Sequence, residues 1–134
     1  MAYPPEYRRF LGLFAAGHYY EGHDVLEELW RQDRQDFYKG LIQFAVGLYH
    51  AGQGNQHGAR ALLARAERHL GPYRPVYAGL DVDDALHAIQ RCRRAVEAGL
   101  PLPPVQLSLR DEALAQEGVA DQVQRGSVPR CGRP

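Results

Sequence analysis

Two side chains of metal-ligating type lie one helical turn apart in the segment EGHDVLEELWR, residues 21–31. A helix would place His23 and Glu27 on one face, four residues apart, with Trp30 three residues further on. Imidazole and carboxylate groups are common protein ligands of zinc, manganese and iron. Leu26 and Trp30 share the stripe, which predicts that this face is turned toward the core. The spacing therefore indicates polar groups aimed at a helix interface.

A second polar line runs through DFYKGLIQFAVGLYHAG, residues 36–52, which is otherwise apolar nearly all round. Lys39, Gln43, Gly47 and His50 follow one helix face at spacings i, i+4, i+8 and i+11. If this segment and residues 19–32 form a hairpin that turns near residues 34 and 35, Glu27 falls level with Gln43 because both helices rise equally. The sequence thus predicts that the two polar lines face each other.

Three interpretations of this polar constellation stay open. Its candidate residues are His23, Glu27, Trp30, Lys39, Gln43 and His50. In the first, they form a buried hydrogen-bond network that fixes helix register, and loss of one member costs about 3 kcal/mol. In the second, His23, Glu27 and His50 bind a divalent metal ion in a hydrolase-like enzyme, where Lys39 stabilises negative charge and Gln43 orients a water. In the third, the two lines bound a small-ligand pocket without a metal.

Signatures of several enzyme classes are missing from the sequence. It has no H-E-x-x-H motif of zinc proteases, and Glu21, Glu27 and Glu28 lack the histidine three residues on that di-iron bundles need. We find no Gly-rich phosphate loop and no Ser/His/Asp or Cys/His set. The sequence therefore assigns no catalytic residue and leaves open whether the protein is an enzyme.

Composition and charge favour a water-soluble cytoplasmic domain. Of 134 residues, 45% are apolar, and sixteen basic residues balance sixteen acidic ones, so no net field recruits nucleic acid or an anionic membrane. No stretch reaches the ~20 apolar residues of a membrane span, and the N-terminus lacks the apolar run of a secretion signal. Cys92 and Cys131 form no C-x-x-C pair, which favours a reducing compartment. We expect the Cys92 side chain to be buried in the core and unreactive. Lys39 is the one lysine of the sequence, which makes it a residue of interest.

Helix start and stop residues predict five helices. They run from Pro4 or Pro5 to Gly17, over about residues 19–32, from about residue 36 to the GQGN turn at 52–55, from Asn55 to Gly71, and from Asp81 to Gly99. We expect Asp33 or Asp36 to cap the third helix, and the apolar third helix to lie at the centre. Short connections predict an all-α, compact antiparallel bundle.

Residues 1–105 are predicted to form one helical domain. The Pro-rich LPLPP at 100–104 reads as an extended strap, and VQLSL at 105–109 as its one strand-like piece. The stretch from 106 to 134 is assigned to the strap and to a polar, aperiodic tail that we expect to be disordered.

Several other features are given ordinary interpretations. Arginines on the fourth and fifth helices are diluted by acids and read as a solvated face rather than an RNA site. The histidines at 57, 69 and 87 are expected to be isolated at the surface. A homodimer that forms through an apolar face of the first or fifth helix is a further hypothesis.

Three successive segments resemble one known family, the domain-of-unknown-function family numbered 309, a group of small bacterial and archaeal helical proteins. The segments are FAAGHYYEGHDVLEELWR, FYKGLIQFAVGLYHAGQGNQHGARALLARAERHL and GLDVDDAL, within about residues 5–105. The family's H-x-x-x-E-x-x-W pattern maps onto His23, Glu27 and Trp30. Its K-G-L-I-Q pattern maps onto Lys39, Gly40, Leu41, Ile42 and Gln43, and the histidine that follows maps onto His50. Its G-N-x-x-G-A pattern maps onto Gly54, Asn55, Gly58 and Ala59.

That resemblance implies an all-α fold and a cytosolic location, and it implies no established activity. Asp24 stands where a glutamate is expected after the histidine. Position 24 points off the stripe of His23 and Glu27, so we expect this departure to matter little.

Overall fold

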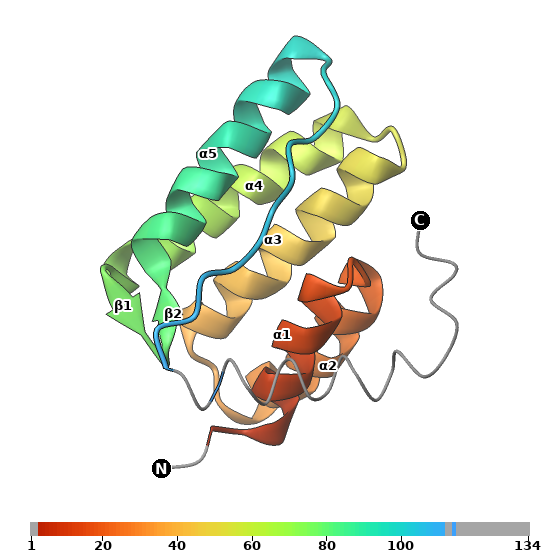
Figure 1. Ribbon diagram of the computed structural model, residues 1–134. Coiled ribbons are helices and arrows are strands. Elements are labelled where there is room, and N and C mark those ends of the chain that lie inside the picture. Colours follow the sequence, from red (N-terminus) through yellow and green to blue (C-terminus); the bar gives the residue numbers. More distant parts are fainter. Residues whose placement is uncertain (1–2, 112–113, 115–134) are drawn as a thin grey trace.

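Helices make up nearly all of the regular structure in residues 3–111 and 114, the part of the chain that the computed structural model describes. They are α1 (Pro5–Ala15), α2 (Tyr19–Gln32), α3 (Asp36–Gly52), α4 (Gln56–Leu70) and α5 (Val82–Ala98). Between α4 and α5 lie a short 3-10 helix, η1 (Gly71–Tyr73), and a small antiparallel sheet of β1 (Val76–Tyr77) and β2 (Leu80–Asp81). Figure 1 shows this arrangement, which confirms the predicted all-α bundle. The helix start and stop residues gave no indication of η1, β1 or β2.

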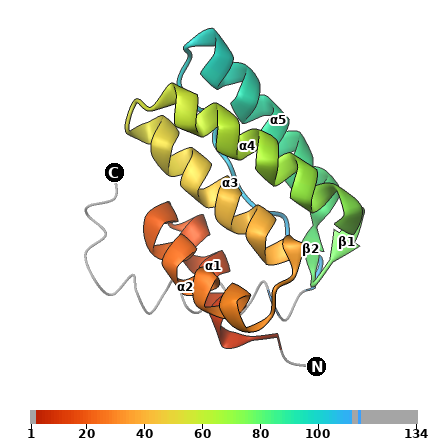
Figure 2. The same cartoon turned by 180° about the vertical axis from the view of Figure 1, so that it is seen from behind.

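The central helix is α3, which lies between α2 and α4 in both views of the bundle (Figures 1 and 2). Its apolar composition explains this position, because a helix with apolar residues nearly all round must be covered on most sides. Two glycines bring α4 especially close. A Cβ on Gly40 would lie 2.7 Å from Leu70 Cγ, and one on Gly47 would lie 3.1 Å from Leu63 Cδ2. The α3 face that carries these glycines is therefore the face against α4.

Local capping residues set the starts of α4 and α5 and the end of α5, as predicted. The side chain of Asn55 accepts a hydrogen bond from the backbone N–H of Gly58 at the start of α4, and Asp81 accepts one from Asp84 at the start of α5. Gly99 ends α5 in the left-handed conformation, with φ of 70°.

The predicted acidic cap of α3 is wrong. Gln35 occupies the N-cap position, and its side chain makes no capping hydrogen bond to the helix. Asp33 instead ends α2, where it accepts a hydrogen bond from the Gln35 side chain, and Asp36 is the first helical residue. At that place a carboxylate still interacts favourably with the helix dipole.

Aromatic residues from α1 and α3 fill the middle of the core. Tyr7, Phe10, Phe37 and Phe44 are fully buried, and the Tyr7 hydroxyl donates a hydrogen bond to the carbonyl of Ala78. Burial raises the pKa of Tyr7 well above its ordinary value. The apolar stripes of α1 and α5 both lie in this core, so the homodimer stays a prediction with no surface assigned to it.

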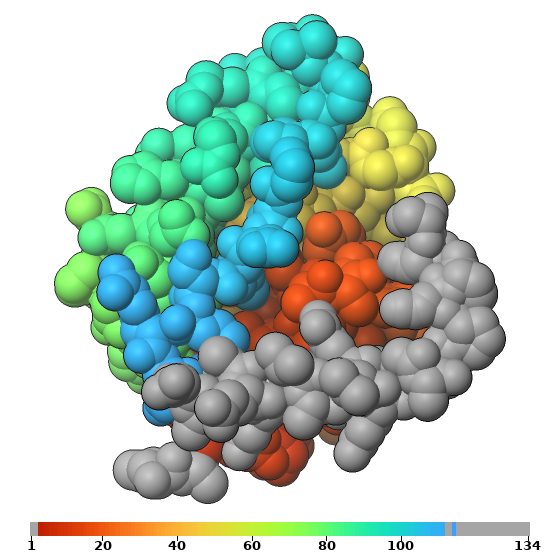
Figure 3. Space-filling view, viewed as in Figure 1, coloured from red at the N-terminus to blue at the C-terminus, as the bar shows by residue number. Residues whose placement is uncertain are grey.

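Residues 100–111 form the expected extended strap, which runs back along the bundle from the end of α5 to β2. Its strand-like piece is real, because Leu109 forms a bridge with Leu80 and the Ser108 carbonyl accepts from the backbone N–H of Asp81. Leu102, Val105, Leu107, Leu109 and Leu114 pack against the core. Figure 3 shows the strap over the seam between α5 and α1. The tail expected to be disordered lies outside the described residues, apart from Leu114.

Within the described residues, no helix combines the length and the apolar character that crossing a membrane requires.

Candidate functional site

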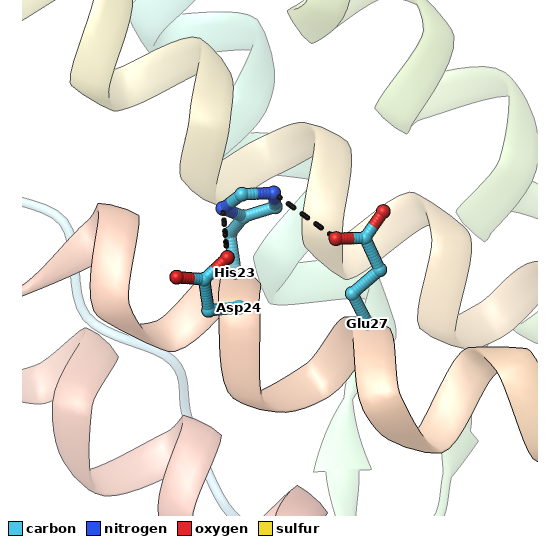
Figure 4. Close-up of side chains that lie close together, drawn as sticks. All are labelled: His23, Asp24 and Glu27. Carbon is cyan, nitrogen blue, oxygen red and sulfur yellow. Dashed lines mark ion pairs between the residues drawn. The ribbon is translucent and has the colours of Figure 1, made fainter.

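His23, Asp24 and Glu27 come together on the surface of α2. One ligand atom from each of the three side chains lies within 4.8 Å of the other two. The imidazole stands between the two carboxylates (Figure 4), with its Nε2 3.5 Å from Glu27 Oε1 and its Nδ1 3.7 Å from Asp24 Oδ1. The helical spacing i, i+4 therefore positions His23 and Glu27 as the sequence predicts, and Asp24 adds a third candidate ligand atom, the second oxygen of the group.

Both nitrogens of the His23 ring face oxygen atoms. Nδ1 is 3.1 Å from the backbone carbonyl of Tyr20, which can only accept a hydrogen bond, so Nδ1 carries a proton and donates it. In the neutral ring Nε2 then presents a lone pair toward the Glu27 carboxylate. Two acceptors that face each other are reconciled by a second proton on the ring, by a water that donates to both, or by a cation between them. A backbone carbonyl behind the far nitrogen is also how metal-ligating histidines are commonly oriented.

The three side chains differ in their access to solvent. His23 is 17% exposed, Glu27 36% and Asp24 65%, so one face of the cluster is open to water. Glu27 also has a cationic neighbour, because Arg31 Nη2 lies 3.7 Å from Glu27 Oε1. An exposed ion pair of this kind contributes about 0–1 kcal/mol, so it would yield readily to a bound metal ion.

Trp30 and Lys39 meet across the α2–α3 turn, as the predicted hairpin requires. The Lys39 Nζ lies 5.0 Å from the centroid of the Trp30 ring, and the Arg34 guanidinium carbon lies 4.4 Å from it. Trp30 packs half-buried against the core, and its indole Nε1 is buried without an acceptor among the described residues. This contact fixes the ends of the two helices relative to each other.

Gln43 does not join the α2 side chains. Its Oε1 accepts a hydrogen bond of 2.7 Å from Nδ1 of His69 on α4. The reason is the close packing of Gly40 and Gly47 against α4, because Gln43 lies on the same helix face as those glycines. His69 was expected to be isolated at the surface, and that expectation is wrong.

The polar constellation is also less buried than predicted. Of its six residues, only Gln43 is buried, at 7% exposed, and the others are half-buried. His50 lies next to Tyr49, with ring centroids 5.9 Å apart. Among the described residues, no hydrogen bond or ion pair joins His50 to His23 or Glu27. The predicted set of His23, Glu27 and His50 therefore stays a prediction.

The remaining candidates behave largely as expected. Cys92 is buried, and burial raises the pKa of its thiol to about 11, which makes it unreactive packing. His57 and His87 are exposed. Arginines on α4 and α5 include Arg93, which pairs with Glu67 between the two helices.

Two residues of interest, Asp24 and His69, were missed in the sequence. Asp24 was discounted because its Cα lies off the stripe, yet its short side chain turns back toward the adjacent imidazole. The sequence signal for Asp24 was its place directly after His23, with the second acid, Glu27, three residues further on. No local signal could have paired His69 with Gln43, because they are 26 residues apart and on different helices.

Comparison with known proteins places this architecture in a family. The family model described as "Domain of unknown function (DUF309)" matches residues 7–62, which include α2 and α3. The uncharacterized protein YpuF of Bacillus subtilis (strain 168) is 35% identical over 121 residues, which cover 85% of this chain and 70% of the relative. No solved structure matches the chain significantly. The chain therefore belongs to the DUF309 family.

Proposed function

We propose that this protein is a metal-binding helical module that holds one divalent ion between His23 Nε2 and Glu27, with Asp24 as the third ligand once its exposed carboxylate turns from the Nδ1 side of the ring toward the ion. The observation that supports the proposal is the convergence of one nitrogen and two oxygen ligand atoms within 4.8 Å of one another. The facing acceptors His23 Nε2 and Glu27 Oε1 add a physical reason, since a cation between them would satisfy both. A cytoplasmic location accompanies the proposal, because the free thiol of Cys92 suits a reducing compartment.

The ligand types restrict which ion would bind. One imidazole and two carboxylates suit zinc, manganese or ferrous iron better than calcium or magnesium, which take oxygen ligands alone. Three protein ligands on an exposed helix face leave positions for water or for a ligand molecule. A water on such an ion loses a proton readily, which is the chemistry that the hydrolase-like alternative among the sequence interpretations requires. Gln43 is engaged by His69, so we assign it no role at the ion.

A structural role is the second candidate function for the polar residues. The hydrogen bond between Gln43 and His69 favours it, because it joins α3 to α4 without involving any proposed ion ligand. The contact of Lys39 with Trp30 joins α2 to α3 in the same way. In this interpretation the imidazole of His23 simply pairs with the Glu27 carboxylate, with no ion between them.

Metal content separates the two candidates. Protein purified without a histidine tag should contain a transition metal in stoichiometric amount by elemental analysis, or should take up zinc or manganese in calorimetric titration. His23→Ala and Glu27→Gln should each weaken binding at least about tenfold. Glu28→Gln and His57→Ala are matched controls, because both side chains are exposed and neither belongs to the cluster.

Two further variants define the ligand set. Asp24→Asn should weaken binding if Asp24 is the third ligand, whereas loss of binding in His50→Ala with none in Asp24→Asn would restore the set predicted from the sequence. A protein that binds no transition metal at all, and whose His23→Ala and Glu27→Gln variants are merely less stable, would contradict the proposal and support the structural role.

A further inference from the structure

Two cationic side chains are gathered on one indole ring at the turn between α2 and α3. The Arg34 Cζ lies 4.4 Å and the Lys39 Nζ 5.0 Å from the centroid of Trp30. We call these three residues the Trp30 cluster. The end of α2, the turn and the first turn of α3 each supply one of them, so the cluster depends on the packing of the hairpin. The negative potential of the indole faces attracts each of the two cations to the same ring, despite their like charge.

Neither cation has a carboxylate partner. Among the described residues, the ion-paired arginines include Arg31, Arg74, Arg93 and Arg110, but neither Arg34 nor Lys39 forms an ion pair. Two acids, at positions 33 and 36, flank the same turn. Asp33 accepts a hydrogen bond from the Gln35 side chain instead, and Asp36 forms no ion pair within the described part of the chain. The cluster therefore presents a guanidinium fork and an ammonium group, neither of which forms an ion pair with a carboxylate of the described residues.

A buried donor belongs to the same cluster. The Nε1–H of Trp30 is shielded from solvent and has no acceptor among the described residues. Buried polar groups in native proteins almost always have a partner, so an unpartnered one calls for an explanation. An oxygen atom of a bound molecule is one group that would satisfy it.

We propose that the Trp30 cluster binds a phosphate group, with Arg34 and Lys39 as the donors and the Trp30 ring as the surface that orients them. A guanidinium can donate two parallel hydrogen bonds to phosphate oxygens, and a lysine beside it adds a point charge. The site is separate from the proposed metal centre, because none of its three residues is a proposed ion ligand. Glu27 lies one turn before Trp30 on α2, so both sites are on the same side of that helix.

Tryptophan fluorescence tests this proposal directly, because Trp30 is the one tryptophan of the chain. Inorganic phosphate is titrated into metal-free protein at constant ionic strength, with chloride as the comparison anion. We expect a saturable change in emission with phosphate and none with chloride. Calorimetry on the same samples gives the affinity independently of the probe. A titration with phenyl phosphate then distinguishes two kinds of ligand. If phenyl phosphate binds more tightly than inorganic phosphate, the natural ligand is a phosphate ester, and if the two bind equally, it is the free anion.

Variants assign the binding to the cluster. Lys39→Met and Arg34→Met should each bind phosphate at least about tenfold more weakly, and Lys39→Arg should keep most of the affinity. Arg94→Met, which removes an exposed arginine of α5, is the control and should bind as the parent does. His23→Ala should also keep phosphate binding, so failure of the metal proposal would not affect this one. Circular dichroism verifies that each variant is folded.

A non-saturable response that chloride reproduces would overturn the proposal. So would equal losses of affinity in Arg94→Met and in Lys39→Met, because phosphate would then respond to the general charge of the surface.

Discussion

His69 of α4 donates a hydrogen bond from Nδ1 to the buried Oε1 of Gln43 on α3, over 2.7 Å. Because Oε1 can only accept, the hydrogen of this bond belongs to Nδ1 of His69. The bond also joins α3 to α4 across the contact between the two helices. The sequence predicted that Gln43 faces α2, but its side chain instead joins α3 to α4.

A double-mutant cycle measures this hydrogen bond. Gln43→Met is nearly isosteric and leaves the donor of His69 without its acceptor, so we expect the free energy of unfolding to fall by about 1–3 kcal/mol. Urea denaturation of Gln43→Met, His69→Leu and the double variant gives the coupling between the two sites. A coupling above about 0.5 kcal/mol is expected for side chains in contact. Strictly additive effects would show that the bond contributes nothing.

Substitution of Gly40 tests the close approach of α3 and α4. A Cβ at this position would meet Leu70 Cγ at 2.7 Å and His69 Cβ at 3.3 Å, so Gly40→Ala should destabilise the protein by about 1–3 kcal/mol. Gly52→Ala is the control, because a Cβ at the end of α3 meets no atom within 4 Å. Its unfolding free energy should stay the same or rise by up to about 1 kcal/mol. A Gly40→Ala protein as stable as the control would mean that α4 lies further from α3.

The N-cap of α5 should make stability sensitive to acid. The backbone N–H of Asp84, together with Arg110, lowers the pKa of Asp81 below its ordinary value of 3.8. A carboxyl whose pKa is lower in the folded state stabilises the fold above its unfolded pKa, and this contribution is lost as the pH falls through the folded pKa. We therefore expect Asp81→Asn to be less stable than the parent at about pH 7, and the difference to shrink at about pH 3.

Urea denaturation at a series of pH values verifies this dependence. Asparagine still caps a helix, so the part of the difference that varies with pH reports the charge. A stability difference between parent and Asp81→Asn that is the same at both ends of the series would contradict the lowered pKa.

The sequence predicted the helices well because their ends depend on local chemistry. Asn55, Asp81 and Gly99 each act on backbone groups within a few residues, and such contacts can be inferred without knowing the rest of the fold. The α2 spacing of His23 and Glu27 is local in the same sense. For these features the pattern of residue types was sufficient.

The contacts between side chains of different helices could not be predicted as well as the helix ends. One residue of a helix turns by about 100°, so a small change in rotation moves a side chain from one neighbour to another. The rotation of α3 is set by the fit of Gly40 and Gly47 against α4, which depends on the shapes of residues far along the chain. Gln43 therefore bonds to His69, although its level in the hairpin suggested Glu27.

All three proposed ion ligands lie on α2, so the position of a bound ion relative to this helix tests the proposed metal centre most directly. Crystals grown with zinc or manganese, with diffraction data collected on both sides of the metal absorption edge, would show the ion as an anomalous difference peak. We predict one strong peak about 2.0–2.2 Å from His23 Nε2 and from an oxygen of Glu27. A map with no peak at these atoms at saturating metal, or with metal at other histidines alone, would contradict the proposed metal centre.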